Sequence, residues 1–500
     1  MKSTGYPSPI TKIANLKIRA SVLATLLALP LSAFSFTIPQ IEVPELPTLD
    51  TPNFDDNTGF KQNGLPLGGW GGKEQQSLTG EGLQNQINSS DQNYLLLRTE
   101  AGSFDAEAMV AITSDATVDG ANRDLRFYQT DGSGVWSIAK NKNFSINSTG
   151  SLQFYGEDAR YLIKQSIGSS LTISANDVWL TNKITQIKSS NGLLIFGNNG
   201  TKTAINAEIT KDFIATLDVR NVNDFESIKY SLIEGSSLSL SASNIFITQE
   251  LQDSNKVSQS TGIALDDGGL DRISTLTATS NISLKGVSTG IYTSSALNIK
   301  ATNLLLDITS YQSLHKSDRY NSGICAQKKL DVDVGLLYIF GAQKALNLQS
   351  ANHTIKASTI YLDAGHAHEI DEALDASISY DFKSSAIKSS LDATTKISAQ
   401  TVLLKNFSNG IVVDDASSLS ITSSDIYIIN EPSSLGEFGI ISNYSSGEIN
   451  SNSLNISGYK VGIGAYDIPF EKPLRSEQKI TLNNELNLEN VKGTSVNSTH

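Results

Sequence analysis

The chain has 500 residues, of which 18% are charged, and its formal net charge is -13 at pH 7. Lys and Arg form no basic block beyond the first twenty residues, so the composition argues against a nucleic-acid partner, which requires clustered cations. Cys325 is the single cysteine and excludes a disulfide framework. It follows Gly323 and Ile324 and is expected to be a buried small hydrophobe.

The beginning of the chain predicts an export signal. Basic residues up to Arg19 precede the apolar run SVLATLLALPLSAFSF, and Ala33 and Ser35 are the small residues that signal peptidase requires. We expect residues 1–35 to be the signal peptide, with cleavage after Ser35 and, as the alternative, after Ala33. The run is short for a membrane span and contains Pro30, so an uncleaved anchor is the less favoured interpretation.

Residues 36–93 are predicted to be a spacer rich in Pro and Gly. In TIPQIEVPELPTLDTP, proline recurs every few residues, which excludes both a helix and regular ladder pairing. Apolar runs between Tyr94 and Gln129 predict strands whose spacing does not match the repeat that follows. Residues 94–143 are therefore expected to be an entry region that covers the open backbone groups of the first coil.

From residue 144 to 490 the chain is organised by a ten-residue pattern, most clearly in LTISANDVWL at 171–180. Apolar residues take the first, third, eighth and tenth places, a small residue the fifth and a short polar residue the seventh. Alternation on both sides of a polar break predicts two short strands around a tight corner. Further copies begin at residues 238, 275, 297, 330, 353, 395, 419 and 447. In the first copy the predicted inward residues are Leu171, Ile173, Val178 and Leu180, and the outward ones are Thr172, Ser174 and Trp179.

Two further signals complete one coil. The seventh place predicts side chains that hydrogen-bond to their own turn, and Leu336 is the misfit there. Gly followed by an aliphatic residue, as in Gly290-Ile291 and Gly439-Ile440, precedes most copies and predicts a third strand. Ala345-Leu346 and Ala386-Ile387 are weaker versions of this signal.

Uninterrupted copies start 22 to 24 residues apart, which is the length of one solenoid coil. The sequence therefore predicts an all-β fold, a right-handed parallel β-helix with coils of about 20–25 residues, followed by a C-terminal tail at 491–500. Insertions are predicted between copies and never inside the pattern, the largest at 309–322, 363–385 and 198–226. The alternative for 198–226 is a coil of its own, formed by the strands AINAEI and FIATLDV, whose phase the pattern does not give. Such loops are expected to carry recognition.

The densest polar cluster, Gly365 to Asp375, contains His366 and His368 at a spacing that first-row metals can bridge. No third His and no Cys accompanies them, so a solvated loop is favoured and no metal site is predicted. These two histidines are the weak candidates for metal binding.

Paired acids suggest a second kind of chemistry. Asp266, Asp267 and Asp271 form one group, and Asp414 and Asp415 another. Polysaccharide-cleaving enzymes on β-helices use clustered carboxylates as general acid and base. Adjacent residues on a strand point to opposite faces, so we favour turn roles and predict no catalytic residue and no cofactor.

The signal peptide, the spacer and the Ser/Asn/Gly-rich stack of Gly-Ile and LxIxA strands resemble the passenger region of bacterial autotransporters, of the pertactin-like and AIDA-like class. The resemblance covers residues 144–490. It implies export across the inner membrane, then display on the outer membrane or release from it. It also implies adhesion to a host or bacterial surface receptor, or self-association.

Such proteins normally end in a translocator β-barrel, whose strands this chain does not show before it ends at VNSTH. We expect a fragment, or a passenger delivered by an outer-membrane partner. The favoured function is a non-enzymatic adhesin. The alternative is an extracellular enzyme that binds or degrades polysaccharide.

Overall fold

The computed structural model describes two compact units, which are treated separately below. The first unit is Ile41–Ala342, and the second unit is Met1–Gln40 with Gln343–His500. No helix among the described residues has the length and apolar character needed to cross a membrane. The described residues are 36–46, 78–89, 94–100, 108–130, 134–185, 193–197, 202–219, 229–251, 259–308, 321–365, 383–431, 435–466 and 476–491.

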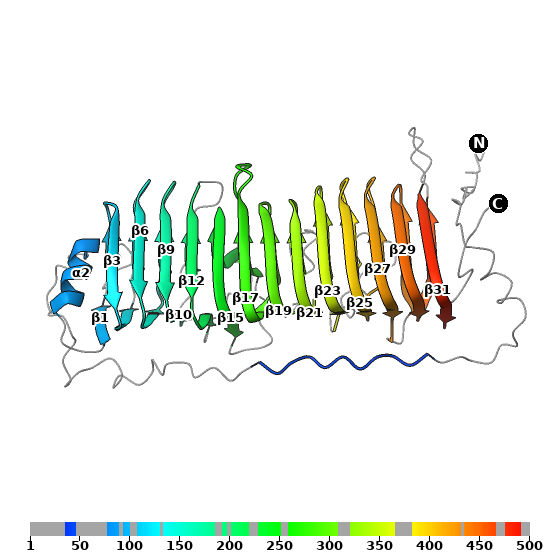
Figure 1. The fold of residues 1–500 in the computed structure, drawn as a ribbon, viewed down its shortest axis with the longest axis horizontal. Helices are drawn as coiled ribbons and strands as arrows, with labels where there is room; N and C mark the ends of the chain where they lie inside the picture. The colour runs from blue at the N-terminus through cyan, green and yellow to red at the C-terminus, as the bar shows by residue number, and fades with distance from the viewer. Residues whose placement is uncertain are drawn as a thin grey trace, which may run out of the picture. The chain divides into compact units, whose positions relative to one another are not determined.

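The first unit is a stack of parallel strands, as Figure 1 shows. The strands that hold the ten-residue pattern pair along one sheet, and the third strands of the coils pair along another. Early coils carry the pattern on two separate strands, whereas β15 pairs with both β12 and β13 and spans the corner as one bent strand. The pattern strands are β1 (Tyr94–Glu100), β3 (Ala116–Ala121), β4 (Asp124–Thr130), β6 (Asn143–Ser148), β7 (Ser151–Glu157), β9 (Ser170–Ala175), β10 (Asp177–Ile184), β12 (Ala204–Ile209), β13 (Asp212–Val219), β15 (Ser237–Leu251), β17 (Ile273–Val287), β19 (Ala296–Ile308) and β21 (Leu330–Phe340). The third strands are β2 (Val110–Ile112), β5 (Trp136–Ile138), β8 (Tyr161–Gln165), β11 (Leu193–Gly197), β14 (Lys229–Gly235), β16 (Gln259–Leu265), β18 (Thr289–Thr293) and β20 (Ser322–Ala326).

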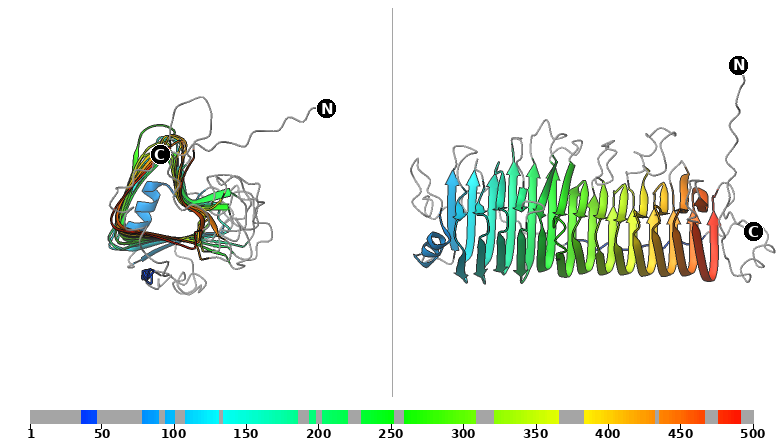
Figure 2. Two further views of the ribbon diagram at one scale, coloured as in Figure 1. Left: turned by 90° about the vertical axis from the view of Figure 1, so that its right-hand side faces the viewer. Right: turned by 90° about the horizontal axis from the view of Figure 1, so that it is seen from above.

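The second unit repeats this arrangement. Its pattern strands are β23 (Asn352–Asp363), β25 (Thr394–Lys405), β27 (Ser418–Ile429), β29 (Ser446–Ser457) and β31 (Glu477–Glu489). Its third strands are β22 (Lys344–Gln349), β24 (Ser385–Ser390), β26 (Asn409–Val413), β28 (Gly436–Asn443) and β30 (Tyr459–Tyr466). In both units the described strand pairs are parallel, and the end-on view of Figure 2 shows that each coil has three sides. The prediction of a parallel β-helix is confirmed.

The alternation of the pattern places the core as predicted. The inward side chains of the first copy are at most 1% exposed, whereas Thr172, Ser174 and Trp179 on the outer side are only half-buried. Cys325, on β20, is 2% exposed and forms no disulfide, as expected of a small hydrophobe. Apolar burial on each coil is the dominant stabilising contribution, because each layer covers the layer before it.

Three copies contain a corner that is one residue longer than the pattern. Ser274 pairs with Leu297 and Asn281 with Asn303, so the copy assigned to Thr275 begins at Ser274 and has eleven residues. The interval 198–226 contains a coil in which Ile205 pairs with Leu238 and Asp212 with Asn244, so this coil also has one extra corner residue. The last coil, KITLNNELNL with Gln478 before it, also has eleven residues, since Gly447 pairs with Gln478 and Ser453 with Glu485. The prediction that nothing is inserted inside the pattern is therefore wrong, because a bulge absorbs an extra corner residue without changing which face points inward.

Glycines form columns where the third strands stack. A Cβ on Gly290 would lie 2.5 Å from the carbonyl oxygen of Gly323, one coil later. A Cβ on Gly410 would lie 2.4 Å from the carbonyl oxygen of Gly439. The Gly-Ile signal therefore reflects backbone approach between coils as well as the start of the third strand.

A short helix covers the first coil. In α2 (Gly80–Ser89), Leu83 and Ile87 are spaced four residues apart on one face and are 0% and 2% exposed. Thr79 caps the helix, because its hydroxyl accepts a hydrogen bond from Gly82 N at 3.1 Å. Leu78 N donates to the carbonyl oxygen of Met109, just before β2, and the carbonyl oxygen of Leu78 accepts from Ala111 N on β2. The interval predicted as spacer thus supplies the cap, and the strands of the predicted entry region already pair in parallel with β6 and β7.

A charged cluster joins coils of the second unit. Glu437 contacts Lys383 at 2.6 Å and Lys460 at 2.8 Å. Burial raises the pKa of Glu437, but the hydrogen bonds and charges of the two lysines outweigh it and hold the pKa below its ordinary value of 4.5.

A lowered carboxyl pKa predicts acid-sensitive stability. The folded state binds the Glu437 proton less tightly than the unfolded chain does, so the stabilisation is fully present above pH 4.5 and is lost as the pH falls through the lowered pKa. We expect Glu437→Gln to lower the free energy of unfolding at neutral pH and to flatten its fall toward about pH 3. Urea denaturation at several pH values measures both. Parallel pH profiles for the variant and the unmodified chain contradict the assignment.

Candidate functional site

The acidic group Asp266, Asp267 and Asp271 lies in the turn between β16 and β17 of the first unit. Asp267 is fully buried, and its carboxylate accepts hydrogen bonds from Gly269 N at 2.8 Å and Arg272 N at 3.1 Å. Asp266 accepts one from Gly268 N at 3.0 Å. Positive φ angles at Gly268, Gly269 and Asp271 let the chain close this turn around the carboxylate.

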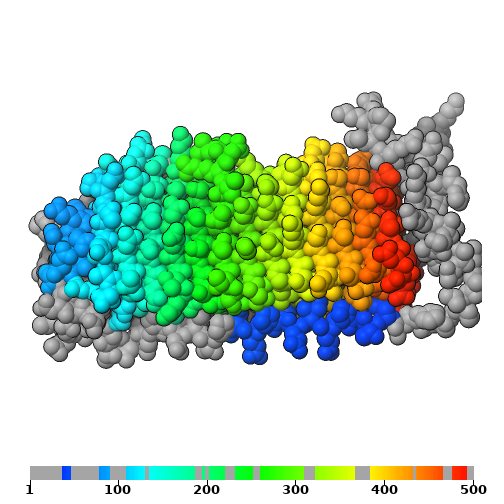
Figure 3. Space-filling model, viewed as in Figure 1, coloured from blue at the N-terminus to red at the C-terminus, as the bar shows by residue number. Residues whose placement is uncertain are grey.

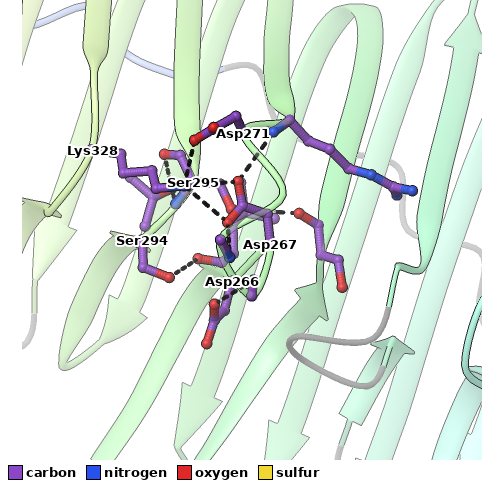
Figure 4. A network of polar contacts seen from close by, with 12 residues as sticks. Asp266, Asp267, Asp271, Ser294, Ser295 and Lys328 are labelled. Carbon is purple, nitrogen blue, oxygen red and sulfur yellow. Dashed lines mark hydrogen bonds and ion pairs between the residues drawn. The ribbon is translucent and has the colours of Figure 1, made fainter.

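Lys328 provides the counter-charge from a turn two coils later. Its Nζ lies 3.2 Å and 3.3 Å from the two carboxylate oxygens of Asp267 and 3.1 Å from Asp271 Oδ1. Figure 4 shows the lysine reaching between the two acids, with Ser294 and Ser295 alongside. Partial burial lowers the pKa of Lys328, but its hydrogen bonds to Asp271 and Asp267 outweigh this and hold the pKa above 10.5.

The same turn also binds to earlier coils. Arg272 donates from Nη1 to the carbonyl oxygens of Lys202 at 3.2 Å and Thr203 at 3.3 Å. In the next coil Ser295, between β18 and β19, donates to the carbonyl oxygen of Ser236 at 3.4 Å. A charged lysine with a raised pKa is a poor nucleophile, and Asp267 already accepts from a lysine and two backbone N–H groups. These bonds join the turn to earlier and later coils, and we call the cluster the clamp.

In the second acidic pair, one carboxylate is buried and the other is exposed. Asp414 is 3% exposed and accepts hydrogen bonds from Asn443 Nδ2 at 2.9 Å and Asp415 N at 3.0 Å. Asp415 is exposed and has a positive φ of 50°. The positive φ of Asp415 and the bond from its N–H to Asp414 place this pair in the turn between β26 and β27, which is the role that the sequence favours.

The predicted metal candidates cannot be placed. His366 and His368 lie outside the described residues. Within the ranges that the structure describes, no group of three or more His, Cys, Asp or Glu side chains could hold a metal ion.

The seventh place of the pattern forms a ladder between coils. Asn244 donates to Asp212 Oδ1 at 2.8 Å, Asn281 to Asn244 Oδ1 at 2.9 Å and Asn303 to Asn281 Oδ1 at 2.9 Å. Leu336 is the register partner of Asn303 in the next coil. These amides were expected to bond to their own turn, and they also bond to one another between coils, because parallel stacking places each amide directly above the equivalent one. Sequence analysis missed this ladder, although the repeated Asn at one place was the available signal.

Outward side chains of the first half of the pattern form two polar columns. Strand register aligns them coil by coil, and Ser239 Oγ lies 3.0 Å from Thr275 Oγ1. In the first unit the second-place column is Thr172, Asn206, Ser239, Thr275, Asn298 and Asp331. The fourth-place column is Ser174, Glu208, Ser241, Thr277, Lys300 and Asp333. Each of these residues is exposed or half-buried, so the columns present polar and charged groups to solvent.

Outward side chains of the second half have the opposite character. The ninth place lies between the buried eighth and tenth places, so its side chain points away from the core. We call this column the ninth-place stripe. In the first unit it is Trp179, Ile214, Phe246, Ser283, Leu305 and Tyr338, and in the second unit Tyr361, Leu403 and Tyr427.

Comparison with protein-family models, with curated proteins and with solved structures finds no match to this chain.

Proposed function

We propose that this chain is an exported bacterial surface or secreted protein of the autotransporter passenger type, acting as an adhesin or in self-association rather than as an enzyme. The observation that carries the proposal is the pair of polar columns. Their side chains repeat at the strand spacing of about 4.8 Å. A partner with repeating groups, such as a surface polymer or a second solenoid, would contact many coils at once, and weak contacts then combine into strong attachment.

The acidic residues support a non-enzymatic role. Glycoside cleavage requires two carboxyl groups flanking one bond in a common cleft. Asp267 is held by Lys328 and two backbone N–H groups, and Asp414 is held by Asn443 and a backbone N–H. Neither carboxylate can leave its turn to transfer a proton without breaking these bonds.

The test uses beads coated with the full chain. Three readouts are measured: clustering of the beads with one another, their binding to bacterial and epithelial cells, and their binding to a panel of polysaccharides. Ser241→Lys combined with Thr277→Lys places two charges on neighbouring coils of the fourth-place column. We expect this variant to lose at least tenfold of the attachment, because two long cationic side chains replace adjacent hydroxyl groups and, next to Lys300, leave three neighbouring coils with the same charge.

The control is Ile167→Lys with Thr279→Lys, which adds the same charge at exposed positions outside both columns. It should attach as the unmodified chain does. Equal loss in both variants, or no attachment in any assay, contradicts the adhesin proposal. Release of new reducing ends from a polysaccharide would favour the enzymatic alternative instead.

A further inference from the structure

The polar columns are the exposed outer face of the first unit. Phe246 and Leu305 of the ninth-place stripe are 3% and 5% exposed, whereas Asn206, Glu208 and Lys300 of the columns are exposed. Figure 3 is viewed as Figure 1 is, and its cyan and green atoms form a continuous surface on the side where β6, β9 and β12 lie. A partner of this unit therefore meets the columns before it meets the stripe.

The fourth-place column carries opposite charges at a fixed separation. Glu208 on β12 is followed, one coil at a time, by Ser241 on β15, Thr277 on β17 and Lys300 on β19. Among the described residues, neither Glu208 nor Lys300 has an ion-pair partner. The series acid, hydroxyl, hydroxyl, base is complementary to itself when it is reversed, so a second copy of this chain offers each charge the partner that it lacks.

A two-fold axis parallel to the strands, placed between β15 and β17, produces the reversed arrangement. It inverts the order of the coils and keeps each column opposite itself. Glu208 of each copy then faces Lys300 of the other, which gives one ion pair on each side of the axis. In the second-place column amides face amides and hydroxyls face hydroxyls, and all of these groups both donate and accept hydrogen bonds. The facing pairs of that column are Asn206 with Asn298 and Ser239 with Thr275.

Other arrangements of the same face bring like charges together. In a parallel dimer each second-place residue faces the fourth-place residue of the same coil, so Asp331 and Asp333 on β21 would oppose each other twice. Sliding one copy of the antiparallel dimer by one coil removes both Glu208–Lys300 pairs, and in one direction it places Glu208 opposite Asp333. Since opposed like charges are unfavourable, charge selects both the orientation and the register.

We propose that the polar columns of the first unit bind a second copy of this chain in an antiparallel dimer with Glu208 opposite Lys300. The inference rests on the proposed function, and it names self-association as the activity and the chain itself as the partner. Six coils with about five residues each cover roughly 17 Å by 29 Å, or about 500 Å², which is less than the ~800 Å² per partner of a standard interface. Such a contact is weak between single chains and strong between surfaces that display many of them.

Charge reversal on beads coated with the full chain tests the pairing. Glu208→Lys or Lys300→Glu alone places like charges opposite each other in both pairs, so bead clustering should fall about tenfold or more. Beads with Glu208→Lys should cluster with beads that carry Lys300→Glu, and the chain with both substitutions should cluster with itself as the unmodified chain does. Both positions are exposed, so circular dichroism should not change.

The matched controls are Lys211→Glu and Glu250→Lys. Both residues are exposed and lie outside the two columns. Each control reverses one charge of the chain, as the test variants do, and should leave clustering unchanged. A fall in clustering equal to that of the column variants would show that total charge, and not the Glu208–Lys300 pairing, governs association.

Cross-linking measures the orientation. Facing sheets lie about 10 Å apart, so a short bis-maleimide joins cysteines at facing positions. A chain with Asn206→Cys mixed with a chain with Asn298→Cys should be cross-linked in the antiparallel dimer, and Thr172→Cys mixed with Ser174→Cys should be cross-linked only in a parallel one. Cys325 is 2% exposed, and the unmodified chain gives the background from this residue.

Three results would overturn the dimer: no clustering of the unmodified chain, equal clustering of the single and double charge reversals, or cross-linking of the Thr172 and Ser174 pair in place of the Asn206 and Asn298 pair. Beads that bind cells or polysaccharides without clustering would overturn the dimer and leave the adhesin proposal standing. Attachment in none of the assays would overturn both.

Discussion

Replacing Ile421 by Asp should destabilise the second unit by roughly 3–5 kcal/mol. Ile421 is fully buried on β27 and lies in register between Ile397 on β25 and Ile449 on β29. A carboxylate at this position has apolar neighbours in both adjacent layers and no partner for its charge. The loss should spread, because each coil of a solenoid is held by the coils on either side of it.

Thr422→Asp is the matched control. Thr422 is the next residue on the same strand, but it is exposed on the outer side. Urea denaturation followed by circular dichroism should show a much lower midpoint for Ile421→Asp and a midpoint close to that of the unmodified chain for Thr422→Asp. Equal midpoints for the two variants would contradict the inward placement. Ile299→Asp, at a side chain that is 2% exposed on β19, is the corresponding change in the first unit.

A single methyl group on Gly290 should destabilise the first unit by about 1–3 kcal/mol. The new Cβ would lie 2.5 Å from the carbonyl oxygen of Gly323 and 3.2 Å from Ile308 Cδ1. The side chain can move, but the carbonyl belongs to the backbone of the next coil. Gly290→Ala therefore requires two stacked strands to separate, which weakens their hydrogen bonds.

Gly235→Ala separates crowding from the general effect of replacing glycine. The nearest atom to a Cβ at Gly235 is Ile205 Cδ1 at 3.5 Å, which is an ordinary contact. This variant should be neutral or more stable by up to about 1 kcal/mol, because alanine restricts the unfolded chain. Thermal unfolding of the two variants should show shifts of opposite sign or a clear difference in size. A small shift for Gly290→Ala would show that the glycine column is not required.

Sequence reasoning identified the fold because burial in this solenoid is periodic. Alternating inward residues such as Leu171 and Ile173 repeat in every coil, and short corners keep the period visible. The coil at 198–226 could not be phased from the sequence for a physical reason. Its Ile209 occupies the place of the small residue, and an extra residue precedes Asp212, so the side chains still alternate correctly while the pattern shifts by one.

The cap and the clamp differ in how far the sequence could reveal them. Thr79 followed by Leu83 and Ile87 is a local helix signal that was available and not used. Lys328, by contrast, is 61 residues from Asp267, and only the stacking of turns from different coils brings the two together. Residues 36–46 form no helix or strand, as their prolines predict.

The amide ladder of the first unit has a direction, and this direction decides how it responds to chemical ageing. Each Asn donates through Nδ2 to the oxygen of the preceding coil, and the series ends at Asp212, which only has to accept. Deamidation of Asn281 would replace its donor with a second acceptor, so two oxygen atoms would face each other across the contact with Asn244. The bond from Asn303 would persist. An acid is therefore harmless at the receiving end of the ladder and damaging in its middle, so the lifetime of these coils depends on the order of Asp and Asn along the column.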